Sequence, residues 1–176
     1  MVGVDYAAEG LDLARGIWDG ILQSPSPEAD GTDEEVAASK RPIDFQILDI
    51  LSLADPAASL PEWLSPEGVG DGGFDVVLDK GTFDAVSLSE AQDPVTGRKR
   101  GVDVYAAAAK RLMKRPGGRM VVTSCNWTEE EVRRWFEDGR EEVEGTLVYE
   151  GRIEYRKFRF GGGEGSSVCT VVFLKI

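Results

Sequence analysis

The stretch from Phe74 to Ala85, which reads FDVVLDKGTFDA, decides the fold of this chain. It opens with an apolar run from Val76 to Leu78 and then changes abruptly to a charged pair, a glycine and a small hydroxyl residue. A short apolar run bounded by turn residues is typical of a strand that is buried on both faces of a parallel sheet. In open α/β sheets, the ligand crevice lies just beyond the carboxyl ends of such strands. The sequence therefore predicts a functional edge at residues 79–82.

Length and charge limit the classes of protein to consider. The 176 residues suffice for one hydrophobic core and little more, so we expect a single domain over residues 1–176. No apolar stretch approaches the roughly 18 residues of a membrane helix, and the start lacks a secretory signal, so a cytoplasmic chain that avoids membranes is expected. A formal net charge of −12 argues against nucleic-acid binding. It leaves open a basic protein partner, or a charge that simply aids solubility.

Histidine is absent from the sequence, and cysteine is rare. Without histidine, a Ser-His-Asp site, a Cys-His site and the common zinc ligand sets are excluded, and we predict no metal site. Acid–base chemistry would fall to carboxylates, lysine, tyrosine or the substrate itself. Cys125 and Cys169 both lie in apolar, strand-like surroundings. This setting predicts buried structural thiols.

Turn residues and hydrophobic periodicity predict an alternation of strands and helices. The predicted strands are residues 2–5, 45–51, 76–78, 119–124, 147–160 and 168–176. The predicted helices are residues 7–22, residues 102–113 and a third that opens at a capping box of Thr128 and Glu131. Residues 24–41 and 52–73 are predicted to be rich in loops, with a short helix around Trp63. The glycine run at 161–167 predicts a hairpin turn, because no Gly-Lys-Ser/Thr follows it.

This alternation predicts an α/β fold with a mostly parallel sheet, helices on both faces and an antiparallel C-terminal hairpin at one edge. Three acids then fall near the ends of predicted strands: Asp5, Asp49 and Asp79. In a doubly wound sheet, an acid at the end of the second strand commonly holds ribose hydroxyls. The pattern resembles the Rossmann-like class I methyltransferases, which bind S-adenosylmethionine across such a sheet.

Four motifs make the resemblance closer. They are Val4–Tyr6, DKGTFDA at 79–85, TSCNWT at 123–128 and FRFGG at 158–162. Together they resemble the protein-lysine methyltransferases that modify translation elongation factor 1-alpha, in particular the Efm4-type branch. The resemblance covers most of the chain except residues 24–41 and 142–155. The second and third motifs are the specific ones, since an acid after a strand is common.

The resemblance implies roles for individual residues. Asp5 would accept hydrogen bonds from the ribose hydroxyls, and Tyr6 would lie beside the adenine. Asp49 would accept from the adenine amino group, with the backbone amide of Ile50 donating nearby. Asp79 would face the methionine portion of the cofactor and the incoming lysine amine. Since a carboxylate also favours the charged amine, the role expected of Asp79 is positioning and not proton abstraction.

Substrate-binding positions are implied at Thr82, Asn126 and Trp127, each with a structural alternative. Thr82 could instead cap the helical turn that follows it, and Asp84 could stabilise that turn. Asn126 and Trp127 could be a turn residue and a packing anchor. Asp5 and Asp49 could instead be ordinary acids at strand ends.

The implied activity is transfer of methyl groups from S-adenosylmethionine to a lysine of a protein, with elongation factor 1-alpha as the expected partner and a monomer as the expected state. One part of the family pattern is missing, because the strand and glycine-rich loop that should precede residues 4–6 are not found. We therefore expect an N-terminally incomplete domain with weak cofactor affinity and low stability. A non-catalytic interaction module or inactive fragment with part of this fold is the alternative, and a nicotinamide-dependent oxidoreductase is more remote.

Overall fold

The computed structural model describes residues 1–23, 42–55, 57–64, 72–89, 101–137, 145–156, 158–160 and 163–176. The chain divides into two compact units, Met1–Asp49 and Ile50–Ile176, and each is described by itself. The loop predicted at residues 24–41 lies outside the described residues. The single domain expected over residues 1–176 stays a prediction.

The first unit is a parallel strand pair with one helix. It consists of β1 (Val2–Asp5), α1 (Ala8–Gln23) and β2 (Asp44–Ile47). β1 and β2 are parallel, so their carboxyl ends meet at one edge, and both β1 and α1 confirm the sequence prediction. The strand predicted at residues 45–51 is too long. The amide of Leu48 donates to the carbonyl of Asp5 at 2.9 Å, and because β1 ends there, the following residues have no further strand to pair with.

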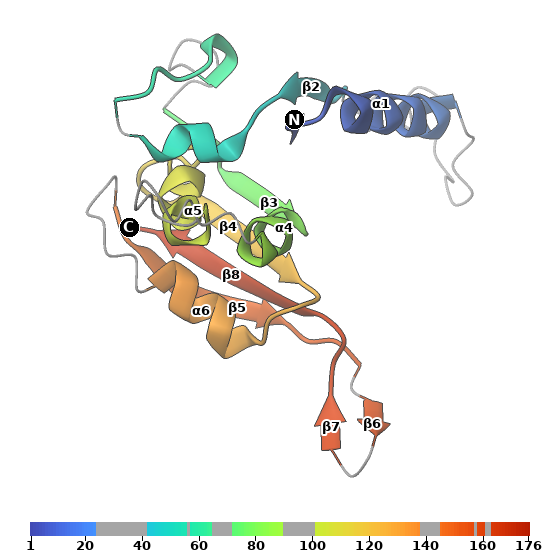
Figure 1. The fold of residues 1–176 in the computed structure, drawn as a ribbon, viewed down its shortest axis with the longest axis vertical. Helices are drawn as coiled ribbons and strands as arrows, with labels where there is room; N and C mark the ends of the chain where they lie inside the picture. The colour runs from blue at the N-terminus through green and yellow to red at the C-terminus, as the bar shows by residue number, and fades with distance from the viewer. Residues whose placement is uncertain are drawn as a thin grey trace, which may run out of the picture. The chain divides into compact units, whose positions relative to one another are not determined.

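The second unit carries a four-stranded mixed sheet with three α-helices. Its elements are η1 (Ile50–Ala54), η2 (Glu62–Leu64), β3 (Val76–Lys80), α4 (Thr82–Leu88), α5 (Gly101–Lys110), β4 (Arg119–Ser124), α6 (Glu129–Glu137), β5 (Leu147–Ile153), β6 (Phe158–Phe160), β7 (Gly163–Gly165) and β8 (Cys169–Lys175). The sheet order is β3-β4-β8-β5 (Figure 1). β3 and β4 are parallel, whereas β8 runs antiparallel to both β4 and β5. The predicted α/β class and the antiparallel pairing of the C-terminal strands are confirmed.

One face of this sheet carries the hydrophobic core. Side chains from α4, α5 and α6 pack there against alternate residues of β4 and β8, and Figure 1 shows the three helices over the same side of the sheet. The centre of the core is aromatic: Phe136 stacks on Phe173 with ring centroids 5.1 Å apart and meets Phe83 edge-on at 5.1 Å. Helices on both faces of one sheet stay a prediction, because the remaining α-helix of the described residues, α1, belongs to the other unit.

β3 differs from the sequence prediction in its burial. The strand is present, but Val76 is 50% exposed and Leu78 is 73% exposed, so it is not buried on both faces. Val77 packs against the core and Asp79 is buried, whereas the alternate residues point to the opposite face. Within the described part of the chain, β3 pairs only with β4, and it therefore lies at the edge of its sheet.

The last predicted strands are also divided differently. The strand predicted at residues 147–160 ends at Ile153, and Phe158–Phe160 pairs instead with Gly163–Gly165 as a separate antiparallel ribbon. The predicted glycine-rich turn therefore contains a short strand, β7. Residues 52–73 contain the end of η1 and the whole of η2 within their described part, and η2 agrees with the short helix expected around Trp63. No helix in the described ranges is long and apolar enough to span a membrane.

Lys175, at the end of β8, joins the sheet to the end of α5. Its side chain is 1% exposed, and its ammonium group donates to the carbonyls of Lys110 and Met113 at 2.7 and 2.9 Å. Carbonyls at a helix C-terminus lack partners within the helix and carry a partial negative charge. The buried ammonium group is therefore placed where the backbone can compensate for its lost hydration.

We expect Lys175→Met to lower the free energy of unfolding by about 2 kcal/mol, because it leaves two buried carbonyls without this donor. Lys114→Met is the matched control. It removes a surface ion pair with Asp75, which has an N–O distance of 3.3 Å, and should cost less than about 1 kcal/mol. Urea unfolding followed by tryptophan fluorescence measures both variants. Equal losses in the two variants would contradict the role given to Lys175.

Candidate functional site

The candidate site in the second unit lies at the carboxyl ends of β3 and β4. These strands are parallel, and Asp79 and Lys80 pair in register with Val122 and Thr123. The motif at 79–85 and the motif at 123–128 therefore meet at the same edge of the sheet, as the sequence predicts. The short helix α4 follows β3, and the segment Cys125–Trp127 follows β4.

Asp79 is turned into the protein at this edge. It is 5% exposed, and one carboxylate oxygen accepts from the amides of Thr82 at 3.0 Å and Phe83 at 3.3 Å. The other oxygen accepts from the amide of Phe83 at 3.1 Å and from the Tyr105 hydroxyl at 2.7 Å. Both oxygens are thus engaged by the first turn of α4 and by α5. Gly81 allows the sharp turn between Asp79 and this helix, with a φ of 88° that favours glycine.

Burial dominates the electrostatics of this pair. It raises the pKa of Asp79 above its ordinary value, although the hydrogen bonds from Tyr105, Phe83 and Thr82 act in the opposite direction. Burial also raises the pKa of Tyr105, and the adjacent Asp79 carboxylate raises it further, so the phenol keeps its proton and remains a donor. The pair is a buried acceptor with its donor, which fixes the position of Asp79.

The segment after β4 is held by a second buried carboxylate. Asp84, in the first turn of α4, is 7% exposed and accepts from the Ser124 hydroxyl at 2.6 Å and from the Cys125 amide at 2.9 Å. The Ser124 oxygen accepts in turn from the amides of Asn126 at 3.1 Å and Trp127 at 3.0 Å. Asp84 therefore stabilises more than its own helical turn, because it ties α4 to the end of β4.

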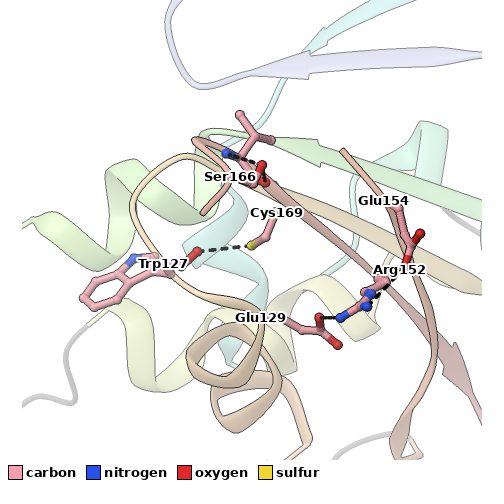
Figure 2. A network of polar contacts seen from close by, with 7 residues as sticks. Trp127, Glu129, Arg152, Glu154, Ser166 and Cys169 are labelled. Atoms are coloured by element: carbon pink, nitrogen blue, oxygen red, sulfur yellow. Dashed lines mark hydrogen bonds and ion pairs between the residues drawn. The ribbon is translucent and has the colours of Figure 1, made fainter. Parts of the chain in front are cut away.

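Trp127 is anchored at both its ring and its backbone. Its indole nitrogen donates to the Ser87 hydroxyl at 2.7 Å. Its carbonyl accepts from the Cys169 thiol at 3.1 Å, as Figure 2 shows. Burial raises the pKa of the Cys169 thiol, which keeps it in the donor form. The prediction that both thiols are buried is wrong: Cys125 is exposed and Cys169 is only partly buried. Cys125 lies in the segment beyond the end of β4, where the apolar strand pattern no longer applies.

A salt-bridge cluster lies beside this segment. Arg152 on β5 donates to Glu129 of α6 at 2.9 Å and to Glu154 at 3.2 Å (Figure 2). The hydrogen bond from Arg152 is the main cause that lowers the pKa of Glu129. The predicted capping box at the start of α6 is confirmed, since Glu131 accepts from the amide of Thr128 at 2.9 Å and the amide of Glu131 donates to the Thr128 hydroxyl at 3.3 Å.

The remaining substrate candidates are accessible to different degrees. Thr82 and Asn126 are exposed, and Trp127 is partly buried. Thr82 contributes its backbone amide to Asp79, so its predicted capping role is taken by Asp79, and α4 has no side-chain cap from its N-cap residue, Gly81. The second unit therefore brings Asp79, Thr82, Asn126 and Trp127 to one edge through α4.

The first unit holds three of the cofactor candidates. Asp5 ends β1 and is partly buried, with one carboxylate oxygen accepting from the Ala7 amide at 2.8 Å. The other oxygen lies so close to α1 that a Cβ at Gly10 would stand 2.7 Å from it. Tyr6 follows with 78% of its surface exposed, and the exposed Asp49 lies two residues beyond β2. Because β1 and β2 are parallel, Asp5 and Asp49 share one edge. Ile50 opens η1 in the second unit.

Sequence reasoning missed three residues that hold the site: Tyr105, Ser124 and Ser87. Tyr105 lies buried in α5, and the partner of its hydroxyl, Asp79, lies 26 residues away in the sequence. A tyrosine on the buried face of a helix needs a partner for its hydroxyl, and this requirement is the signal in the sequence that points to Tyr105. Ser124 lies within the TSCNWT motif at 123–128, whereas nothing in the sequence marks Ser87.

We expect Tyr105→Phe to lower the free energy of unfolding by about 1–2 kcal/mol at neutral pH, because Asp79 loses a buried donor. The pKa of Asp79 is raised in the folded state, so the protonated carboxyl favours folding. Its contribution to the free energy of unfolding is present in acid and is lost as pH rises through the folded-state pKa. Removing the phenol raises the pKa further, so the defect should be larger at neutral pH than in acid. Urea unfolding at both conditions measures it.

Tyr6→Phe is the matched control, because Tyr6 is 78% exposed. It should change the free energy of unfolding by less than about 0.5 kcal/mol, with no dependence on pH. A Tyr105→Phe defect that is equal at neutral and acid pH would contradict the coupling between Tyr105 and the charge on Asp79.

Comparison with known proteins identifies relatives along nearly the whole chain, although no protein-family model matches it. Over 99% of its length the chain is 34% identical to "Protein-lysine N-methyltransferase EFM4" of Saccharomyces cerevisiae, covering 59% of that protein. Over 98% it is 32% identical to "EEF1A lysine methyltransferase 2" of Danio rerio, covering 55%, and 28% identical to efm4 of Schizosaccharomyces pombe, covering 56%.

The solved structures that match the chain share little sequence with it. A TehB-like SAM-dependent methyltransferase from Corynebacterium glutamicum matches 99% of this chain and 67% of its own, at 16% identity and a TM-score of 0.49. A SAM-dependent methyltransferase from Methanosarcina mazei matches 99% and 81%, at 12% identity and a TM-score of 0.49. On its sequence, the chain is a homologue of the EFM4 and EEF1A lysine methyltransferase 2 proteins, and it spans somewhat more than half of their length.

Proposed function

We propose that this chain is the greater part of an S-adenosylmethionine-dependent protein-lysine N-methyltransferase with a class I methyltransferase domain. The observation that carries the proposal is the similarity to the yeast protein-lysine N-methyltransferase EFM4 over 99% of the chain. The structure supports it with parallel strands whose carboxyl ends gather the motif residues at shared edges, where ligands of α/β sheets bind. We propose that both units belong to one domain.

The residues of the first unit suit the nucleoside part of the cofactor. A carboxylate at the end of a parallel strand, followed by an exposed aromatic ring, offers acceptors for ribose hydroxyls and a flat surface for adenine. We assign these roles to Asp5 and Tyr6. Asp49 at the same edge would accept from the adenine amino group, and the backbone amide of Ile50 would donate nearby.

Asp79 suits an indirect role better than direct contact. Its carboxylate is 5% exposed, and both oxygens accept hydrogen bonds from the protein. We propose that it positions the turn at Gly81 and the exposed Thr82, which would border the methionine portion and the lysine side chain. Direct contact between the Asp79 carboxylate and the amine stays a prediction.

The chemistry needs little acid–base assistance. When bound, the cofactor supplies a methyl carbon already activated by its sulfonium, so a neutral lysine amine can displace the thioether in line. The protein has to hold the amine in alignment and keep it neutral, and partial burial of the amine lowers its pKa. Asn126 and Trp127, at the end of β4, would line the path of the lysine side chain. A chain without histidine can perform this reaction.

Translation elongation factor 1-alpha is the substrate that we propose, because relatives carry EEF1A lysine methyltransferase in their names. The net charge of −12 favours a basic protein partner over nucleic acid. We further propose a cytoplasmic monomer that binds no membrane.

The decisive experiment is radiolabelled methyl transfer from S-adenosylmethionine to purified elongation factor 1-alpha, with any coding sequence that precedes Met1 included in the enzyme. Asp5→Asn should weaken cofactor binding by about tenfold in calorimetry, because one acceptor for the ribose hydroxyls becomes a donor. Asp12→Asn, which removes a surface pair with Arg15 on α1, should leave binding unchanged. The activity proposal fails if the unaltered enzyme transfers no methyl group.

The second candidate is a non-catalytic interaction module. The observation that favours it is the exposure of β3, where Val76 and Leu78 present apolar surface and β4 is the only described partner strand. Such a module would be stable as the 176-residue chain and retain a protein partner, yet bind no S-adenosylmethionine. Calorimetry with the cofactor separates it from the enzyme.

A further inference from the structure

Asp84 forms its side-chain hydrogen bonds outside its own helix. It lies in the first turn of α4, yet its two carboxylate oxygens accept from Ser124 and Cys125, which are 40 and 41 residues away in the sequence. Its side chain is 7% exposed, and a carboxylate that buried requires strong partners. The partners are both at the end of β4, where the lysine path is proposed.

The choice of an acid at this position follows from the two donors it faces. One oxygen meets an O–H at 2.6 Å and the other meets an N–H at 2.9 Å. An ionised carboxylate has only acceptors and satisfies both donors at once. The amide of an asparagine must direct its NH₂ group at one of the two, so the isosteric neutral side chain loses a hydrogen bond.

Ser124 links Asp84 to the backbone of Asn126 and Trp127. Its side chain is buried, and its hydroxyl donates a hydrogen bond to Asp84. The same hydroxyl oxygen accepts hydrogen bonds from the amides of Asn126 and Trp127. A serine hydroxyl has one proton and two acceptor positions, and here all three are used. The consecutive amides of Cys125, Asn126 and Trp127 are therefore all bound by the Asp84–Ser124 pair.

The ring of Trp127 is fixed by the same helix. Its indole N–H donates to the Ser87 hydroxyl at 2.7 Å, and that hydroxyl donates to the backbone carbonyl of Asp84 at 3.0 Å. Beneath this network Asp84 and Ser124 are buried, whereas Cys125 and Asn126 are exposed above it. The buried hydrogen-bond network of Asp84 and Ser124 therefore fixes the backbone conformation of the exposed segment above it.

We propose that Asp84 is a positioning residue that holds the segment Cys125–Trp127 in the shape that receives the substrate lysine. The proposal rests on the proposed lysine methyltransferase function, in which Asn126 and Trp127 line the lysine path. The proposal predicts different effects on the two ligands. Loss of the Asp84 charge should weaken productive binding of the protein substrate. Cofactor binding should stay intact, because the proposed nucleoside contacts are made by other residues.

The experiment compares Asp84→Asn with Asp75→Asn in the same enzyme used for the methyl-transfer assay. Asp75 lies just before β3, and its side chain is 84% exposed, so the control makes the same chemical change without touching the segment. Asp84→Asn should raise the KM for the protein substrate by about tenfold and change the cofactor Kd by less than about twofold. Asp75→Asn should change neither. An unchanged KM, or a cofactor Kd that rises as much as the KM, overturns the proposal.

Amide hydrogen exchange provides a readout that needs no activity. In Asp84→Asn, exchange at residues 125–127 should accelerate by about tenfold, while exchange in the central strands β4 and β8 stays unchanged. Uniform acceleration would mean general destabilisation and would overturn positioning, as would no change at these amides. If the unaltered enzyme transfers no methyl group, the proposed function fails, and this exchange pattern still decides whether Asp84 holds the segment.

A double-mutant cycle tests the route through Ser124. Ser124→Ala removes the acceptor for two amides and the donor to Asp84, so its effect on KM should match or exceed that of Asp84→Asn. If the two residues act as one unit, Asp84→Asn combined with Ser124→Ala should raise the KM little more than Ser124→Ala alone. Independent, multiplying effects on KM would show that Asp84 does not act through Ser124.

Discussion

The second unit depends on the buried carboxylate of Asp79. A charged group that loses its hydration needs compensation from the protein, and Asp79 obtains it from the first amides of α4 and from the Tyr105 hydroxyl. These contacts join β3, α4 and α5 at one point. Since α4 has only seven residues, its propensity alone cannot keep it helical in water. The hydrogen bonds of Asp79 therefore determine where α4 lies relative to β3 and α5.

Asp84 extends the same principle to the next strand. Asp79 precedes the short helix α4, and Asp84 lies in its first turn. Each acid accepts hydrogen bonds from another element: Asp79 from α4 and α5, and Asp84 from the end of β4. Buried polar groups that are fully paired specify one arrangement, because any shift leaves a costly unpaired group. Two such groups therefore fix α4 against both the end of β3 and the segment after β4, which is where the proposed substrate side of the site lies.

Most of the helices and strands could be predicted from local patterns in the sequence. The strand at 119–124 and the capping box at Thr128 are set by neighbouring residues, and both match the structure. The helix predicted over residues 102–113 is also present, but it ends three residues earlier, at Lys110. The shared edge of the two motifs also follows from the sequence, because parallel strands bring their carboxyl ends together. Burial of β3 and of Cys125 was predicted wrongly. An apolar run indicates a strand, but it does not state how many neighbours cover it.

The distant partners of the two acids could not be predicted, because Tyr105, Ser124 and Cys125 lie 26 to 41 positions away in the sequence. The sequence places Asp79 at a strand end, and from there its side chain can face either the crevice or the protein. In the structure the Asp79 side chain faces the protein interior, and this orientation affects the protonation expected of the substrate amine. A free carboxylate beside the substrate amine would favour the ammonium form, which cannot attack a methyl group. A carboxylate already engaged by the Tyr105 hydroxyl and by the amides of Thr82 and Phe83 shapes the edge while placing less of its charge on the amine. In a site that works by alignment, acids that act through the backbone are better suited than acids that point at the reactant.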